Sequence, residues 1–224
     1  MGQSNETKGK ERDSSKTAIY LILNLKKIIT DVDGTLTDGC HYFKSVEQKK
    51  PYAFKNFEPH VGDAFDIAEE LEIPVEVITS GKNGLPWSVR LGNHFPKRVK
   101  GTGFTTPRPV TYVNRRERRQ LLKDQKELTL FLCDSYKDLE DVIAVENKNI
   151  LPIPSPVTDF RVAEELKKVF EKNAIEFGFH EHNVIWGYMA RFFRSTQNEA
   201  YNRAGFFHNV VYSLKTLAKG IKNN

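Results

Sequence analysis

Two carboxylates one residue apart offer the clearest chemistry in this chain. Asp31 and Asp33 follow an apolar, β-prone run at residues 25–29, and Gly34 and Thr35 come directly after them. The pattern predicts a buried strand that runs into a loop. Two like charges at this spacing repel each other, so a fold keeps them together when a cation or a shared proton offsets the repulsion. The sequence therefore favours a bound Mg²⁺ ion at this loop.

A second polar group follows the next apolar run. Residues 73–79 predict a short buried strand, and Ser80, Gly81 and Lys82 come directly after it. A hydroxyl group and free backbone N–H groups at a turn from strand to helix are suited to binding phosphate oxygens. Ser-Gly is also a common turn sequence, so this segment alone supports either interpretation.

A third group ends the most apolar stretch of the chain. Residues 128–133 are nearly all apolar, as expected of a central parallel strand, and Asp134 and Asp138 follow. Two acids at this spacing could bind a metal ion, or one of them could cap the helix that is predicted over residues 139–144.

Together these segments resemble the motifs of the haloacid dehalogenase (HAD) superfamily. The stretch from Asp31 to Gly39 is typical of its small sugar-phosphate phosphatases, which are related to KDO 8-phosphate phosphatase. The resemblance covers roughly residues 27–144. It implies that Asp31 is the nucleophile that accepts the phosphoryl group, and that Asp33 is the general acid and base, with its backbone carbonyl on the metal. It also implies phosphate contacts from Gly34 and Thr35.

The other motifs of the family match less completely. Ser80 and Gly81 fit the second motif, in which Lys82 replaces the usual arginine. The resemblance implies that Ser80 and its neighbours contact phosphate. In the fourth motif Asp134 would bind Mg²⁺ directly, and Asp138 would act through water or orient the site.

The third motif of the family is a lysine that steadies the transferred phosphoryl group, and here it has no clear match. Lys100 follows a predicted strand end and is the first choice, with Arg115 and Arg116 at a predicted helix start as the fallback. They belong to a segment, residues 97–126, with ten Lys or Arg residues against two acids. Such a segment forms either a solvated face or an anion-binding surface.

The order of elements predicts the fold class. Strands alternate with helices over residues 62–71, 85–91 and 160–170, which favours a three-layer α/β/α sandwich with a central parallel sheet. Residues 95–99 are expected to add a third strand. Two aromatic segments between residues 40 and 57 predict a β-hairpin insertion. Residues 149–156 are expected to be a loop or a short edge strand.

The chain is expected to divide into three parts. Residues 1–16 form a polar tail, residues 17–172 the phosphatase-like domain, and residues 173–224 a C-terminal helical extension that is rich in aromatic and basic side chains. The extension is expected to pack on its own domain or on a second subunit, so a homo-oligomer stays open. Stacking on nucleic acid is the less favoured alternative.

Composition narrows the setting of the protein. The 224 residues are 39% hydrophobic and 28% charged, without an apolar run long enough for a membrane span or a signal pattern at the start. The two cysteines, Cys40 and Cys133, suit a reducing compartment, which favours a cytoplasmic protein. The net charge of +5 favours anionic partners, either phosphate esters or nucleic acid.

The sequence thus predicts a Mg²⁺-dependent phosphomonoester hydrolase that forms an aspartyl-phosphate and acts on a small sugar or sugar-acid phosphate. One alternative is a phosphatase for nucleotides or polynucleotide ends that uses residues 97–126. Another is a non-catalytic binding or assembly protein that retains the HAD fold.

Overall fold

The structure is a computed structural model, and it describes most of the chain between residues 23 and 222. The expected tail at residues 1–16 lies outside the described residues, as do residues 177–204 of the expected extension. The described ranges are 23–38, 42–43, 53–54, 56–58, 60–80, 87–99, 101–102, 104–155, 157–176 and 205–222.

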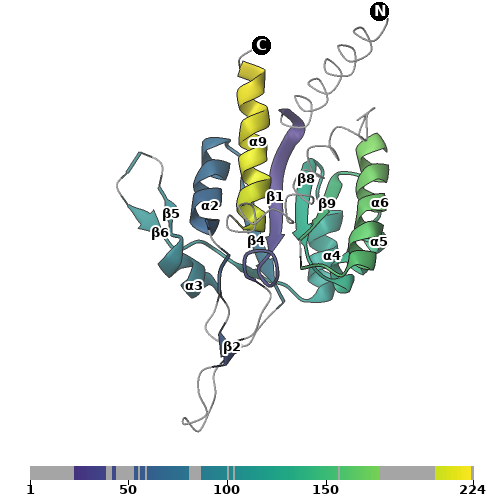
Figure 1. Cartoon of the computed structure of the whole chain (residues 1–224), viewed down its shortest axis with the longest axis horizontal. Coiled ribbons are helices and arrows are strands. Elements are labelled where there is room, and N and C mark those ends of the chain that lie inside the picture. The colour runs from purple at the N-terminus through teal and green to yellow at the C-terminus, as the bar shows by residue number, and fades with distance from the viewer. Residues whose placement is uncertain are drawn as a thin grey trace, which may run out of the picture.

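A five-stranded parallel sheet forms the middle of the molecule (Figure 1). Strand β1 (Leu25–Asp31) lies at its centre, between β4 (Val75–Thr79) and β8 (Leu128–Cys133). Strand β7 (Thr111–Tyr112) forms the edge beside β4, and β9 (Ile150–Pro154) forms the other edge beside β8. All the neighbouring pairs are parallel. The expected α/β/α sandwich is therefore confirmed.

Alternation along the strands divides the core between the two faces of the sheet. Ile28 of β1 and Leu130 of β8 belong to one apolar cluster, whereas the adjacent Ile29 and Phe131 belong to the other. Successive side chains of a strand point to opposite faces, so both faces need apolar residues. This explains why all six residues of β8 are buried.

Helices cover both faces. Beside the first cluster lie α2 (Val61–Glu70) and α9 (Phe206–Lys222), which run side by side (Figure 1). The other face is covered by α4 (Arg115–Lys123), α5 (Tyr136–Val145) and the first half of α6 (Phe160–Glu176). A shorter helix, α3 (Trp87–His94), follows β4. Among the described helices, none combines the length and apolar character needed to cross a bilayer.

Helix α9 is part of the domain core. The Phe207 ring is fully buried and meets the Phe65 ring of α2 edge to face, with the centroids 5.0 Å apart. At the start of α9, the Phe206 N–H donates to Glu58 Oε2 at 2.5 Å. The expected domain boundary at residue 172 falls inside α6, which continues to Glu176.

Two small hairpins stand outside the central sheet. The expected one pairs β2 (Tyr42–Phe43) with β3 (Ala53–Phe54). The other pairs β5 (Lys97–Arg98) with β6 (Thr105–Thr106), so the expectation that residues 95–99 add a third strand to the main sheet is wrong. The chain turns back at Gly101, whose φ of 78° favours glycine, and pairs with itself instead.

Within residues 149–156, expected as either a loop or an edge strand, Ile150–Pro154 form the edge strand β9. Pro152 and Pro154 lie opposite Phe131 and Cys133 of β8. Proline lacks the N–H that a further neighbouring strand would need, so two prolines in one strand fit the edge of a sheet.

Candidate functional site

Three strands end at the same edge of the sheet, and each delivers a predicted site residue there. Strand β1 ends at Asp31, which pairs with Ile78 of β4, while Thr30 pairs with Leu132 of β8. Because these strands are parallel, Asp31, Ser80 and Asp134 follow three neighbouring carboxyl ends. This edge is where parallel α/β sheets bind ligands.

Threonine hydroxyls fix the loop after β1. The backbone oxygen of Val32 accepts hydrogen bonds from the N–H of Leu36 at 3.0 Å and of Thr37 at 3.2 Å. The Thr37 hydroxyl accepts from the Gly34 N–H at 3.2 Å. Thr35, which is fully buried, donates its hydroxyl proton to the backbone oxygen of Asp31. These bonds satisfy a buried loop internally, which the threonines at positions 35 and 37 make possible.

Gly34 lets the fourth-motif segment approach this loop. Its φ is 75°, and a Cβ atom at this position would lie 2.0 Å from Asp134 Oδ2. Both the left-handed backbone and the close approach require glycine. The Asp31–Thr37 loop and the segment after β8 therefore meet without space for any larger side chain.

Three carboxylates converge at this meeting point. Asp31, Asp134 and Asp138 each offer an oxygen atom, and these atoms all lie within 4.8 Å of one another. We call these three residues the acidic cluster. Carboxylate oxygens are hard ligands of the kind that Mg²⁺ binds. Asp31 of the first motif thus lies beside Asp134 and Asp138 of the fourth, whereas Asp33 is not one of the three.

The electrostatics of the acidic cluster favour a bound cation. Burial, followed by the charges of Asp138 and Asp134, raises the pKa of Asp31 well above its usual value. Burial, Asp138 and Asp33 raise the pKa of Asp134 to about 7. Like charges held together disfavour ionisation unless a cation is present. Asp33 lies outside the acidic cluster, but its charge acts on both of these carboxylates.

The two carboxylate oxygens of Asp138 make different contacts. Its Oδ2 accepts hydrogen bonds from the backbone N–H groups of Asp134 and Ser135 and from the Ser135 hydroxyl, which completes a capping box at the start of α5. Its buried Oδ1 makes no hydrogen bond to the described residues, although it lies 2.5 Å from Arg118 Nη1. Ser135, rather than an aspartate, is the N-cap, so α5 starts at Tyr136 instead of residue 139.

Arg118 is the cation that the sequence analysis missed. It lies within α4 and is 7% exposed, and it also contacts Asp141 Oδ2 through Nη2 at 2.5 Å. Burial alone would lower the pKa of Arg118, but Asp138 and Asp141 raise it, and Asp31 contributes. The available signal was its position four residues before the buried Leu122, which puts both side chains on the inner face of the helix.

The other predicted phosphate contacts are placed as follows. Ser80 is exposed directly after β4. Arg115 is bound to Glu140 and Asp141 of α5, and Arg116 is exposed on α4. Gly81, Lys82 and Lys100 lie outside the described residues.

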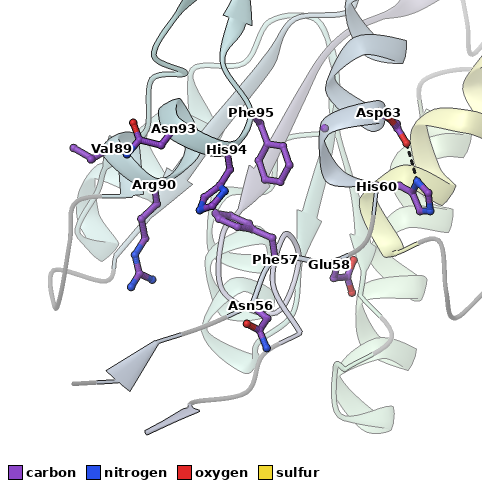
Figure 2. A pocket seen from close by; sticks show the side chains of 11 residues that line it. Asn56, Phe57, Glu58, His60, Asp63, Val89, Arg90, Asn93, His94 and Phe95 are labelled. Atoms are coloured by element: carbon purple, nitrogen blue, oxygen red, sulfur yellow. Dashed lines mark hydrogen bonds and ion pairs between the residues drawn. The ribbon is translucent and has the colours of Figure 1, made fainter. Parts of the chain in front are cut away.

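A cavity of about 800 Å³ opens between α3 and the segment before α2 (Figure 2). Its wall is joined to the Asp31–Thr37 loop, because the Glu58 N–H donates to the Leu36 backbone oxygen at 2.9 Å and Thr37 bridges to Phe57. Figure 2 shows the rings of Phe57, His94 and Phe95 gathered on one side. The residues that line the cavity are Asn56, Phe57, Glu58, His60, Gly62, Asp63, Val89, Arg90, Asn93, His94 and Phe95.

Comparison with known proteins gives matches among solved structures. Neither a family model nor a curated protein matches the chain. A protein from Legionella pneumophila described as a HAD superfamily (subfamily III A) hydrolase is 18% identical, with a TM-score of 0.47, over 84% of this chain and 100% of that one. A hypothetical protein from Xanthomonas campestris is 22% identical, with a TM-score of 0.45, over 80% and 93%.

A third similar structure is a KDO 8-phosphate phosphatase from Moraxella catarrhalis in complex with magnesium, phosphate and KDO. It is 16% identical, with a TM-score of 0.41, over 74% of this chain and 98% of that one. The solved structures that resemble this chain thus include HAD superfamily hydrolases.

Proposed function

We propose that this chain is a Mg²⁺-dependent phosphomonoesterase of the HAD type that acts through an aspartyl-phosphate. The observation that carries the proposal is the acidic cluster, in which three carboxylates from two motifs share one edge of a parallel sheet. Only glycine fits at position 34 beside Asp134, because any side chain there would collide with the Asp134 carboxylate. Carboxylates that repel one another stay together in a fold when they bind a cation.

The proposed chemistry uses Asp31 and Asp33 in turn. An Asp31 oxygen attacks the phosphorus atom, the bond from phosphorus to the ester oxygen breaks, and Asp33 gives its proton to that leaving oxygen. Asp33 then takes a proton from the water molecule that hydrolyses the aspartyl-phosphate and regenerates Asp31. Splitting the reaction in this way replaces one difficult step by two easier ones.

The donor set fits Mg²⁺. Asp31 and Asp134 would hold it through carboxylate oxygens, with the backbone carbonyl of Asp33 as a further ligand. Asp138, whose Oδ1 is paired with Arg118, would act through a water molecule. When bound, Mg²⁺ neutralises charge on the phosphoryl oxygens. Arg118 is the best candidate for the third-motif cation, because it faces Asp138 inside the site.

The large cavity supports a small sugar or sugar-acid phosphate as the substrate. Asn56 and Asn93 offer hydrogen bonds to hydroxyl groups, Arg90 suits a carboxylate, and the Phe57 ring offers an apolar face. A polynucleotide end is less favoured, because the exposed acids Glu117 and Asp124 lie among the basic side chains of α4.

The test is hydrolysis of p-nitrophenyl phosphate and of a panel of sugar, sugar-acid and nucleotide phosphates, with Mg²⁺ and with EDTA. We expect Asp31→Asn to lower the rate at least about 10³-fold with the fold intact, because it removes the nucleophile. Asp124→Asn, at the exposed end of α4, is the matched control and should keep full activity. Mass spectrometry of acid-quenched enzyme should find one added phosphoryl group on Asp31. Full activity of the Asp31→Asn enzyme would refute the mechanism.

A further inference from the structure

A second cavity, of about 500 Å³, lies between α4 and α5 and is separate in its lining from the one in Figure 2. Basic side chains make up most of its wall, and no acidic residue is among those that line it. The lining consists of Arg115, Arg116, Arg119, Gln120, Lys123, Ala144 and Val145. We call this the α4–α5 cavity.

Two of its arginines are held in place by one buried acid. Arg119 Nε lies 2.6 Å and Arg115 Nε 3.0 Å from the same oxygen, Oδ1, of the fully buried Asp141. Burial would raise the pKa of Asp141, but Arg119, Arg115 and Arg118 lower it, so it stays ionised. Each guanidinium has five N–H donors. The side chains of Arg115 and Arg119 are 47% and 40% exposed, so donors remain for a ligand. Their positions are fixed before any ligand arrives, which lowers the entropic cost of binding.

The other two cations have no such partner. Arg116 and Lys123 are exposed, and no hydrogen bond or ion pair to another described residue is found for the side chain of either. Acidic side chains lie on the same two helices but do not line the cavity. Glu117 and Asp124 are exposed on α4, and Glu140 on α5 is partly exposed. A long polyanion lying across the helices would therefore meet these acids, whereas a compact anion inside the cavity would meet its basic side chains.

We propose that the α4–α5 cavity is a binding site for a small ligand that carries two or more phosphate groups. Arg116 and Lys123 match the charge of one phosphate dianion, and the remaining donors of Arg115 and Arg119, which are held in place, suit bidentate contacts with the oxygens of a second phosphate group. The volume lies within the range of small-molecule sites, about 300–1,000 Å³. The acidic surroundings favour a compact anion over a nucleic acid strand. The site does not depend on the proposed phosphatase activity.

Isothermal titration of the full chain with pyrophosphate in excess EDTA tests this proposal without turnover. We expect wild-type protein to bind one pyrophosphate. The double variant Arg116→Gln/Lys123→Gln should bind at least about tenfold more weakly, because it removes two charge-assisted contacts. Lys126→Gln/Lys148→Gln removes the same charge from exposed positions that do not line the cavity, and should bind as the wild type does.

Four outcomes would overturn the proposal. They are absence of binding to the wild type, unchanged affinity in the Arg116→Gln/Lys123→Gln protein, an equal loss in the control, and tighter binding of a single-stranded oligonucleotide through the same two residues. Asp31→Asn should leave pyrophosphate binding unchanged, because Asp31 is not among the residues that line the α4–α5 cavity. A chain that binds pyrophosphate here without hydrolysing any phosphomonoester would contradict the proposed function alone.

Discussion

Replacing Asp134 by asparagine should have opposite effects on stability with and without Mg²⁺. The fold raises the pKa of Asp134 from 3.8 to about 7, so its ionised form is less favourable in the folded state than in the unfolded chain. This destabilisation grows as the pH rises from about 4 and is complete above pH 7. An asparagine amide is neutral and can donate a hydrogen bond toward Asp138. At pH 8 in EDTA the variant should therefore be more stable than the wild type.

The size of the effect follows from the same shift. At 1.36 kcal/mol per pKa unit, the rise corresponds to at most about 4 kcal/mol. Solvent screening of the partly exposed Asp134 carboxylate lowers the expected gain to about 2 kcal/mol. In a protein of this size, that raises the melting temperature by about 4–8 °C. A hundredfold excess of Mg²⁺ over its Kd should stabilise the wild type by about 2.7 kcal/mol, and the variant hardly at all.

Thermal and urea unfolding at pH 8, each in EDTA and in Mg²⁺, measure both effects. Asp124→Asn is the control, and its stability should change by less than about 0.5 kcal/mol in either buffer. A variant that is less stable than the wild type in EDTA would contradict the repulsion within the acidic cluster. An undiminished response to Mg²⁺ would show that Asp134 does not bind the ion.

Three other substitutions have defined outcomes. Gly34→Ala should abolish Mg²⁺ stabilisation and hydrolysis, since its methyl group would lie 2.0 Å from a carboxylate oxygen, whereas Gly101→Ala, with a similar φ and open space, should keep both. Arg118→Met should cost about 3 kcal/mol in urea unfolding because it leaves a buried carboxylate without the guanidinium facing it, and Arg118→Lys should restore part of the stability and of the Mg²⁺ affinity. Phe207→Ala should cost about 3–5 kcal/mol, and Tyr212→Ala, which is 53% exposed on the same helix, less than about 1 kcal/mol.

The parts of the fold that could be predicted are those with long, uniform patterns. The apolar runs that became β1 and β8 predict strands, and the polar residues after them could be assigned to one sheet edge because parallel strands share that edge. Strand β7 could not be predicted, since its two residues, Thr111 and Tyr112, carry no periodicity. Residues 95–99 contain Phe95 and Val99, which favour strands, but propensity does not say which partner a strand takes.

Side-chain direction limited the prediction of the site. Arg115 and Arg116 were chosen because they begin a helix, whereas the arginine that reaches the acidic cluster, Arg118, lies one turn further on the inner face. Its partners come from α5, about twenty residues later in the chain, and no local pattern joins them. The packing of α9 against α2 could not be predicted either. The aromatic residues of α9 predict that it is buried, but not which surface it packs against.

The position of α9 has a consequence for synthesis of the protein. A ribosome releases the chain from its N-terminus, so β1, β4 and β8 emerge long before Phe207 and Val211, which cover one face of that sheet. Until then the part of this face that α9 covers is exposed to solvent and to other nascent chains. Chaperones that bind exposed apolar surface should therefore bind the growing chain after β8 has emerged and release it only when α9 has packed against the sheet.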